Sequence, residues 1–329
     1  MHFAFSDEQL ALRDAVRDLL TKECPPAAVR TAWSSDDGRC PGAWTALTEM
    51  GVLGVTAPES LGGLGLGEVD LVLVLEESGR FALPVPIVET AAVAVPMLAA
   101  RGDERATELI GGASAALVHA LTPYAVWADS ASCIVVLGSA RWSALPTPQV
   151  GLVPVESVDG ARRLFGLELA DSSAWASSTE DDADVDLAFD RAALGTAAQL
   201  VGLADRMIEM TVAYASERRQ FGVPIGSFQA VKHHLANARL ALEFARPLVY
   251  RAAWCVAARD PERGVAVSLA KASASDAALL AARVALQCHG AIGYTTEYDL
   301  HLFMKRAWAL AATWGDAAWH RARVGRAIL

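Results

Sequence analysis

The residues best suited to chemistry lie in one short stretch, Glu217 to Gln229, which reads E-R-R-Q-F-G-V-P-I-G-S-F-Q. It offers a cation at Arg218, an aromatic ring at Phe221 and an amide at Gln229. Arginine makes strong charge-assisted hydrogen bonds to phosphate, and its planar group suits a rigid site. The stretch could therefore clamp a phosphorylated aromatic ligand, although a basic helix end followed by a tight connection explains the same residues.

Two helical patterns must position this stretch. Upstream, apolar residues recur at three- and four-residue steps and mark one face of a helix: Leu194, Ala198, Val201, Ala204, Ile208, Val212 and Ala215. Downstream, a stricter seam of the kind found in helix bundles comprises Val231, Leu235, Ala238, Leu242, Ala245, Val249, Ala252 and Val256. Between them Gly222, Pro224 and Gly226 end the first helix and turn the chain.

This stretch resembles the R-x-x-F-G-x-x-I-x-x-F-Q signature of the acyl-CoA dehydrogenases. A second stretch, Gln287 to Glu297 (Q-C-H-G-A-I-G-Y-T-T-E), resembles that family's Q-x-x-G-G-x-G-Y-x-x-E, and Ala57 to Gly67 is similar to its P-E-x-x-G-G-L-G. The resemblance implies a mainly α fold: an N-terminal helical domain, a small antiparallel β domain and a C-terminal four-helix bundle.

The resemblance also implies which residues face FAD. Arg218 would meet the pyrophosphate, Phe221 would pack on the adenine and Gln229 would hydrogen-bond the nucleotide. Gln287 and Gly290 would present polar and backbone groups to the same cofactor, which in this family belongs to the neighbouring subunit. Ala291 stands where the family has the second glycine of the pair, and its Cβ could hinder a close backbone approach.

The same resemblance predicts no catalytic residue in this chain. Family members use a glutamate to remove the α proton of the thioester, most often just before a glycine, and Trp314 occupies that position. The alternative family position falls at Ala192. Trp314 continues an apolar stripe that predicts one helix over Leu300 to Val324.

Three other acids deserve comparison with the missing base. Asp190 is two residues from Ala192, and its place before Arg-Ala-Ala indicates a helix N-cap. Glu243 lies on a polar helix face, within reach of Arg239 or Arg246. Glu297 matches a structural glutamate of the family. We expect none of them to be the base.

The flavin-ring motifs of the family are also reduced. The resembled T-E-P-x-x-G-S-D survives only as Thr122-Pro123 followed by Ala128-Asp129, and there is no W-[IV]-[TS] triplet. We therefore interpret the chain as the short, catalytically silent subunit of a heteromeric acyl-CoA dehydrogenase, like those of actinobacteria that act on steroid side-chain CoA esters. A longer catalytic subunit would share FAD with it, as an α2β2 assembly using acyl-CoA as substrate and electron-transfer flavoprotein as acceptor. The alternatives are a self-sufficient homo-oligomer with an atypical base and a flavin-free structural homologue.

Composition agrees with a helical protein of two or three domains. The chain has 329 residues, 53% hydrophobic but only 7% aromatic, and a formal net charge of -10, which argues against a nucleic-acid surface. The N-terminus lacks the features of a signal peptide, and we identify no apolar run that approaches the roughly 18 residues needed to span a membrane. We therefore expect a cytoplasmic protein without membrane contact. Five scattered cysteines suggest reduced thiols, and the histidines show no metal-ligand spacing.

The predicted domains span residues 1–112, 113–189 and 190–329. The first begins with Ser6 as an N-cap in a capping box with Gln9. The second contains short β-favouring runs, which we place at 115–121, 133–137, 151–155, 164–169 and 185–189. The third contains four helical patterns, of which the last two cover 265–287 and 300–324.

Overall fold

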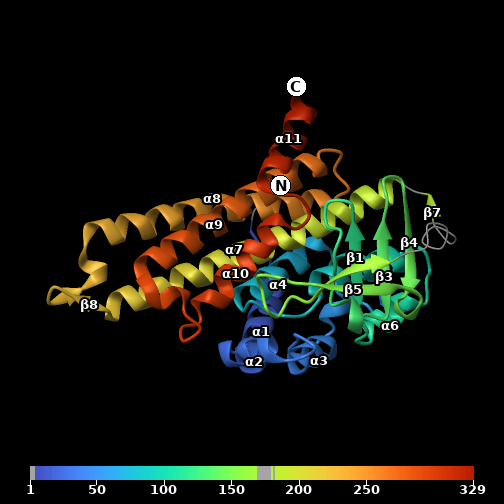
Figure 1. Cartoon of the computed structure of the whole chain (residues 1–329). Helices are drawn as coiled ribbons and strands as arrows, with labels where there is room; N and C mark the ends of the chain where they lie inside the picture. The colour runs from blue at the N-terminus through green and yellow to red at the C-terminus, as the bar shows by residue number, and fades with distance from the viewer. Residues whose placement is uncertain (1–3, 169–178, 181) are drawn as a thin grey trace.

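The computed structural model describes residues 4–168, 179–180 and 182–329. In chain order it places a group of short helices, a small β region and a bundle of long helices (Figure 1). The first group comprises α1 (Asp7–Glu23), α2 (Pro26–Ser34), α3 (Pro41–Glu49), α4 (Glu68–Arg80), the π-helix η3 (Val88–Ala94), α5 (Val95–Ala99) and α6 (Arg105–Ile110), with short 3-10 turns η1 (Val52–Gly54) and η2 (Glu59–Leu61).

Helix α1 begins as its sequence predicts. The Ser6 hydroxyl accepts a hydrogen bond from the backbone N–H of Gln9 at 3.2 Å, and the Gln9 side chain accepts one from the backbone of Ser6 at 2.9 Å. This reciprocal capping box satisfies two N–H groups that a helix start would otherwise leave unpaired. The capping box expected at Ser6 is confirmed.

The β region contains two small sheets. One has the order β1-β3-β4-β7, with β1 (Ala115–His119), β3 (Cys133–Leu137), β4 (Arg141–Pro146) and β7 (Thr179–Glu180). The other has the order β2-β6-β5, with β2 (Ala125–Val126), β6 (Leu164–Glu168) and β5 (Gly151–Val155). The described pairings are antiparallel except that of β1 with β3, which is parallel. The carboxyl ends of β1 and β3 therefore lie at one edge of the sheet.

Two expectations for this region need correction or qualification. Residues 185–189, predicted as a strand, belong to helix α7, because their apolar side chains are buried in the bundle. Strand β4 was not predicted at all. The last residue of the predicted strand 164–169 lies outside the described residues.

The bundle consists of long helices that pack side by side (Figure 1). They are α7 (Asp182–Glu217), α8 (Gln229–Ala257), α9 (Arg263–His289), α10 (Leu300–Ala312) and α11 (Ala317–Ile328). Alanine, leucine and valine side chains from the predicted seams of α7 and α8 lie in the core, although Val212 is exposed. The predicted helix 300–324 is instead two helices, separated around Trp314.

Helix α4 of the first group lies directly against α7. A Cβ at Gly202 would come within 1.9 Å of the Glu76 carbonyl oxygen, and a Cβ at Gly79 within 2.0 Å of the Gln199 carbonyl oxygen. The two glycines therefore let the helix backbones touch. This contact fixes the N-terminal helices on the bundle.

One helix, spanning Arg263–Tyr294 with its terminal turn, is long and apolar enough to cross a membrane by length and composition. From the sequence, residues 265–287 of this helix are predicted to belong to the bundle. About 67% of its most apolar window is buried inside the protein, as in the core helix of a bundle. Length and composition alone are weak evidence for a membrane span.

Candidate functional site

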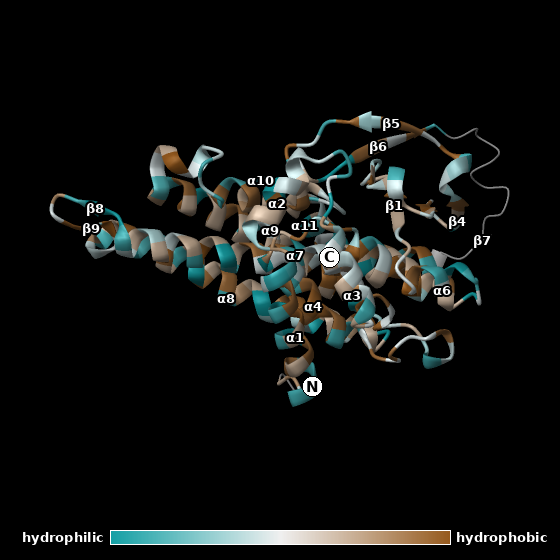
Figure 2. Cartoon of the chain, turned by 90° about the horizontal axis from the view of Figure 1, so that it is seen from below, coloured by the Kyte–Doolittle hydropathy of each residue, from teal (hydrophilic) through white to brown (hydrophobic). Residues whose placement is uncertain are grey.

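The predicted clamp stretch forms a hairpin that projects from one end of the bundle (Figures 1 and 2). Helix α7 ends at Glu217, and β8 (Arg219–Gln220) pairs with β9 (Val223–Pro224). The turn residues Phe221 and Gly222 both have positive φ, 52° and 83°. Two left-handed residues in a two-residue loop match the strand twist of a tight hairpin.

Phe221 is an unusual residue for this turn. A left-handed conformation disfavours a bulky residue and costs on the order of 1–3 kcal/mol. Its side chain is nevertheless 94% exposed, and its ring meets that of Phe228 edge-on at a centroid distance of 6.2 Å. A strained, exposed aromatic ring on a rigid corner contributes little to the core, which favours a role in binding.

The second predicted segment lies at the same end of the bundle. Helix α9 ends at His289, whose ring stacks on Tyr214 of α7 at a centroid distance of 4.3 Å. Tyr214 is four residues before Arg218, and His289 is two residues after Gln287. The structure thus brings both motif segments to one end of the bundle.

Each predicted clamp side chain is available at this end. Residues Arg218, Phe221, Gln229, Gln287, Gly290 and Ala291 are all exposed. In the part of the chain that the structure describes, the side chains of Arg218 and Gln229 make no hydrogen bond or ion pair. Gly290 adopts φ 66° and ψ −146°, a conformation essentially restricted to glycine, and this lets the chain leave α9.

The usual base position is closed by packing. Trp314 is 1% exposed and has a φ of 57°, and Gly315 follows with a φ of 88°. Helix α10 ends at Ala312, and the chain continues through the extended Thr313 and these two left-handed residues. Asp316 then caps the start of α11. The predicted continuous helix over 300–324 is therefore wrong, although the expected burial of Trp314 is confirmed.

Trp314 also contacts Thr122, which belongs to the remnant of the flavin-ring motif. The Trp314 backbone N–H donates to the Thr122 hydroxyl at 2.9 Å. Its ring lies 6.1 Å from the rings of both His119 and Phe189. The Thr122 hydroxyl is therefore already hydrogen-bonded within the protein, and aromatic side chains pack beside it.

The alternative base position offers no free carboxylate either. Ala192 is completely buried on α7. Asp190 is not an N-cap, as expected from the sequence, but lies inside α7 and pairs with Arg323 at 2.8 Å and Arg263 at 3.1 Å. Burial raises the pKa of Asp190, against the effect of the two arginines. Asp190 thus ties α7 to α9 and α11.

Glu243 and Glu297 lie away from these positions. Glu243 pairs with both candidate arginines, Arg239 at 2.6 Å and Arg246 at 3.1 Å, so the expected pairing is confirmed. Glu297 is exposed just before α10. Neither is arranged as a desolvated base.

One further acid, not considered from the sequence, is the half-buried Glu89. Glu89 lies on η3, and in the described part of the chain it has no ion pair within 4 Å. Burial raises its pKa, while Arg162 and Arg306 oppose that rise. Arg162 donates to the Thr313 hydroxyl at 3.0 Å, beside Trp314. A single acid in the apolar run that follows Pro86 was the signal that could have revealed it.

Among the described residues, no cluster of three or more histidine, cysteine, aspartate or glutamate side chains could hold a metal ion. The site therefore has two separate parts, an exposed clamp at one end of the bundle and a closed position at Trp314.

Comparison with known proteins matches most of the chain. Residues 6–109 match the model of the acyl-CoA dehydrogenase N-terminal domain, and residues 184–329 match that of the acyl-CoA dehydrogenase C-terminal domain. The acyl-CoA dehydrogenase IpdE2 of Mycobacterium tuberculosis is 36% identical over 307 residues, which cover 92% of this chain and 91% of that protein.

Solved structures share the fold. The ChsE4-ChsE5 complex from Mycobacterium tuberculosis matches with a TM-score of 0.88 and 24% identity, covering 99% of this chain and 98% of the matched chain. Butyryl-CoA dehydrogenase from Megasphaera elsdenii matches with a TM-score of 0.85 and 21% identity over the full length of both chains.

Proposed function

This chain belongs to the acyl-CoA dehydrogenase family, oxidoreductases that act on acyl-CoA, and we propose that it is the silent subunit of a heteromeric member. In this proposal it supplies the contacts to the ADP part of an FAD whose ring lies in a longer catalytic subunit. That subunit carries the base and the ring-binding motifs. The observation that carries the proposal is the contrast between an open clamp and a closed base position.

The clamp residues fit the ADP part of FAD. The Arg218 guanidinium and the Gln229 amide have no protein partner in the described residues, so their donors remain for a ligand. Phe221 offers an exposed ring to a purine base. Arg218 would bind the pyrophosphate, and Gln287 with the backbone at Gly290 and Ala291 would border the same nucleotide.

The residues at Trp314 do not fit the flavin ring. The Thr122 hydroxyl is occupied by the Trp314 backbone, and aromatic side chains fill the adjoining space. FAD supplies the hydride acceptor of the family's reaction, and this chain holds neither the ring nor a base beside it. Its contribution is therefore to bind and orient the nucleotide.

Named relatives support an assembly of two kinds of subunit. A structure with the same fold is a complex of two differently named chains, ChsE4 and ChsE5. By analogy we infer an α2β2 assembly in the cytoplasm, acting on an acyl-CoA such as a steroid side-chain CoA ester and passing electrons to an electron-transfer flavoprotein.

The test is to produce the chain alone and together with a longer dehydrogenase encoded beside it. Alone, it should be colourless or insoluble, and the co-purified complex should be yellow with the absorbance of bound flavin. Stoichiometric flavin in the lone chain would contradict the proposal. A well-assembled complex that carries no flavin and shows no dehydrogenase activity would favour the flavin-free homologue.

Glu89 favours a second candidate, a self-sufficient enzyme with an atypical base. The Glu89 carboxyl has a raised pKa and lies in the field of Arg162, whose side chain bonds to Thr313 beside the usual base position, and a raised pKa is what general-base catalysis requires. Glu89→Gln distinguishes the two, with Glu243→Gln as the matched control. The leading proposal expects turnover within a few-fold for both variants, whereas a base at Glu89 predicts a loss of about a hundredfold or more for Glu89→Gln alone.

A further inference from the structure

A cavity of about 390 Å³ lies where the N-terminal helices meet the bundle, away from both parts of the site described above. Arg17 and Thr21 of α1, Arg80 and Phe81 at the end of α4, Arg206 of α7 and Phe303 of α10 are among its lining residues. Its volume is near the lower end of the range of roughly 300–1,000 Å³ for small-molecule pockets. It therefore suits a small ligand.

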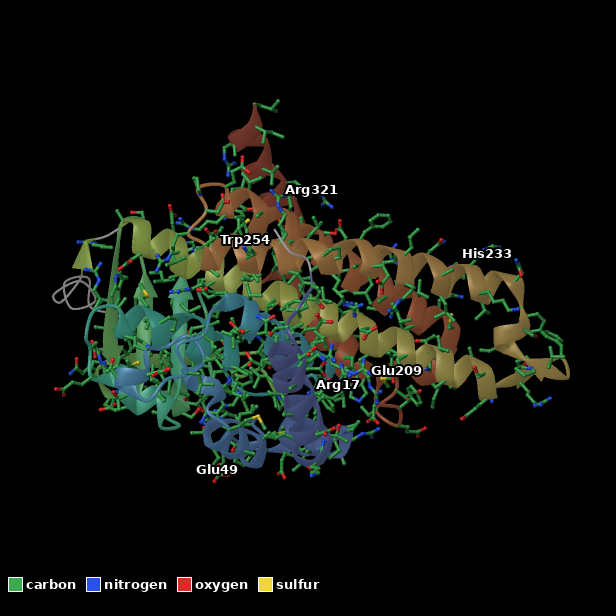
Figure 3. All side chains as sticks on the ribbon, turned by 180° about the vertical axis from the view of Figure 1, so that it is seen from behind. Arg17, Glu49, Glu209, His233, Trp254 and Arg321 are labelled. Carbon is green, nitrogen blue, oxygen red and sulfur yellow. The ribbon has the colours of Figure 1, made fainter. Side chains whose placement is uncertain are left out.

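Three guanidinium groups line this cavity, and each is held by an acid that does not line it. Arg17 binds Glu77 through Nε and Nη2, at 3.0 and 2.5 Å. Arg80 binds Asp205 at 2.9 Å and Glu209 at 2.5 Å. Through these two ion pairs Arg80 bridges α4 and α7. Figure 3 labels Arg17 and Glu209.

These ion pairs leave donors unused. In the described part of the chain, no acceptor is bound by Nη1 of Arg17 or Nε of Arg80. Arg206 uses only Nη1, at 2.9 Å from Glu209, so its Nε and Nη2 are also open. Fixed guanidinium groups with open N–H donors are preorganised for a carboxylate, because little rotamer entropy remains to be lost.

Apart from Thr21, whose hydroxyl donates to the Arg17 carbonyl oxygen, the rest of the lining is apolar. Phe81, Phe303, Pro25 and Pro26 contribute rings, and the buried thiol of Cys24 lies among them. No aspartate or glutamate lines the cavity within the described residues. A ligand that matches this lining has one anionic head and an apolar body.

The cavity is separate from the clamp and from the base position. Arg206 lies on α7, 12 residues before Arg218 of the clamp and 14 residues after Ala192, the alternative base position. At 1.5 Å per residue these separations are about 18 and 21 Å along the helix. One ligand in this small cavity cannot also occupy either position.

We propose that this cavity binds a small organic acid, with its carboxylate on the open donors of Arg17, Arg80 and Arg206 and its apolar body against Phe81 and Phe303. The proposal does not depend on FAD binding. It gives the protein a binding site for an apolar acid at the junction between the N-terminal helices and the bundle.

The test is calorimetric titration of the full chain, in its complex if a partner is needed for solubility, with octanoate as probe. We expect one saturable site per chain, with binding of 1-octanol at least about tenfold weaker, since only the carboxylate uses charge-assisted hydrogen bonds. Inorganic phosphate tests for a plain anion site. Phosphate binding as tight as that of octanoate would overturn the apolar part of the proposal.

Arg206→Gln removes two open donors. Within the described residues Arg206 has one ion pair, a half-exposed one with Glu209, so the fold should persist. Octanoate binding should weaken about tenfold, which corresponds to roughly 1.4 kcal/mol. Arg239→Gln is the matched control, because Arg239 pairs with Asp205 and Glu243 but does not line the cavity. Absence of octanoate binding, or equal weakening in both variants, would overturn the proposal.

Discussion

At the scale of single residues, a buried ammonium group supports the turn at Trp314. Lys271 is fully buried, and its Nζ donates to the carbonyl oxygens of Ala311 and Gly315, both at 3.1 Å, and to the Ser275 hydroxyl at 3.2 Å. Among the described residues no carboxylate lies within 4 Å of it. Burial lowers the pKa of Lys271 to about 7, although the negative charge of Asp316 acts in the opposite direction.

This pKa predicts a pH dependence of stability. Between pH 7 and about 10.5 the unfolded lysine binds a proton that the folded one has lost, so stability rises with pH across this window. The slope contributed by one such group is at most about 1.4 kcal/mol per pH unit. Urea unfolding at several pH values should show this slope in the wild type but not in Lys271→Met, whereas parallel curves would contradict it.

Arg218 carries the residue-scale prediction for the clamp. Arg218→Ala should weaken FAD binding to the complex by about 1.5–3 kcal/mol, because a charge-assisted contact to phosphate is lost. The adjacent Arg219 is a suitable control, since its side chain already bonds to the Gly222 carbonyl within the hairpin, at 3.4 Å. Flavin release should be measured by fluorescence, with circular dichroism to verify folding. Equal FAD affinity in wild type and Arg218→Ala would remove Arg218 from the site.

At the scale of elements, the sequence predicts the long helices and the ends of the clamp well, because their apolar spacing and the glycines between them are local signals. The break at Trp314 was missed because the apolar stripe passes through it at helical spacing, and only Gly315-Asp316 signals the new start. The role of Asp190 was missed for a different reason. Its partners, Arg263 and Arg323, lie 73 and 133 residues away, so no local pattern reports them.

The close contact between α4 and α7 predicts the sign of a stability change, that of Gly202→Ala. By helix propensity alone, glycine to alanine in a helix stabilises by up to about 1 kcal/mol. At Gly202 the new methyl group would lie 1.9 Å from the Glu76 carbonyl oxygen, so Gly202→Ala should instead destabilise by about 1–3 kcal/mol. Gly325→Ala, where nothing lies within 4 Å, is the control and should be neutral or stabilising. Thermal unfolding that ranks the two variants the other way would contradict the backbone contact.

At the scale of the whole molecule, the two parts of the site lie far apart on one bundle, and only one of them is open. The clamp projects from the end of the long helices (Figure 1). Trp314, by contrast, contacts Thr122 and His119 of the β region. A chain arranged in this way can contribute to a cofactor site on a neighbour without completing its own. This arrangement predicts how many FAD molecules the proposed complex binds.

The last prediction is the flavin content of that assembly. Each FAD needs an open binding site for its isoalloxazine ring, and in our proposal only the long subunit provides one. A complex of two long and two short subunits should therefore bind two FAD molecules and not four. Flavin absorbance against protein concentration, with subunit ratio from quantified gel bands, measures this directly. Trp314→Ala is the informative variant, because it empties the position without providing the missing ring motifs, so the count should stay at two. Four FAD molecules in the wild-type complex would mean that the packing around Trp314 and Thr122 opens on assembly, and the silent role proposed for this chain would be wrong.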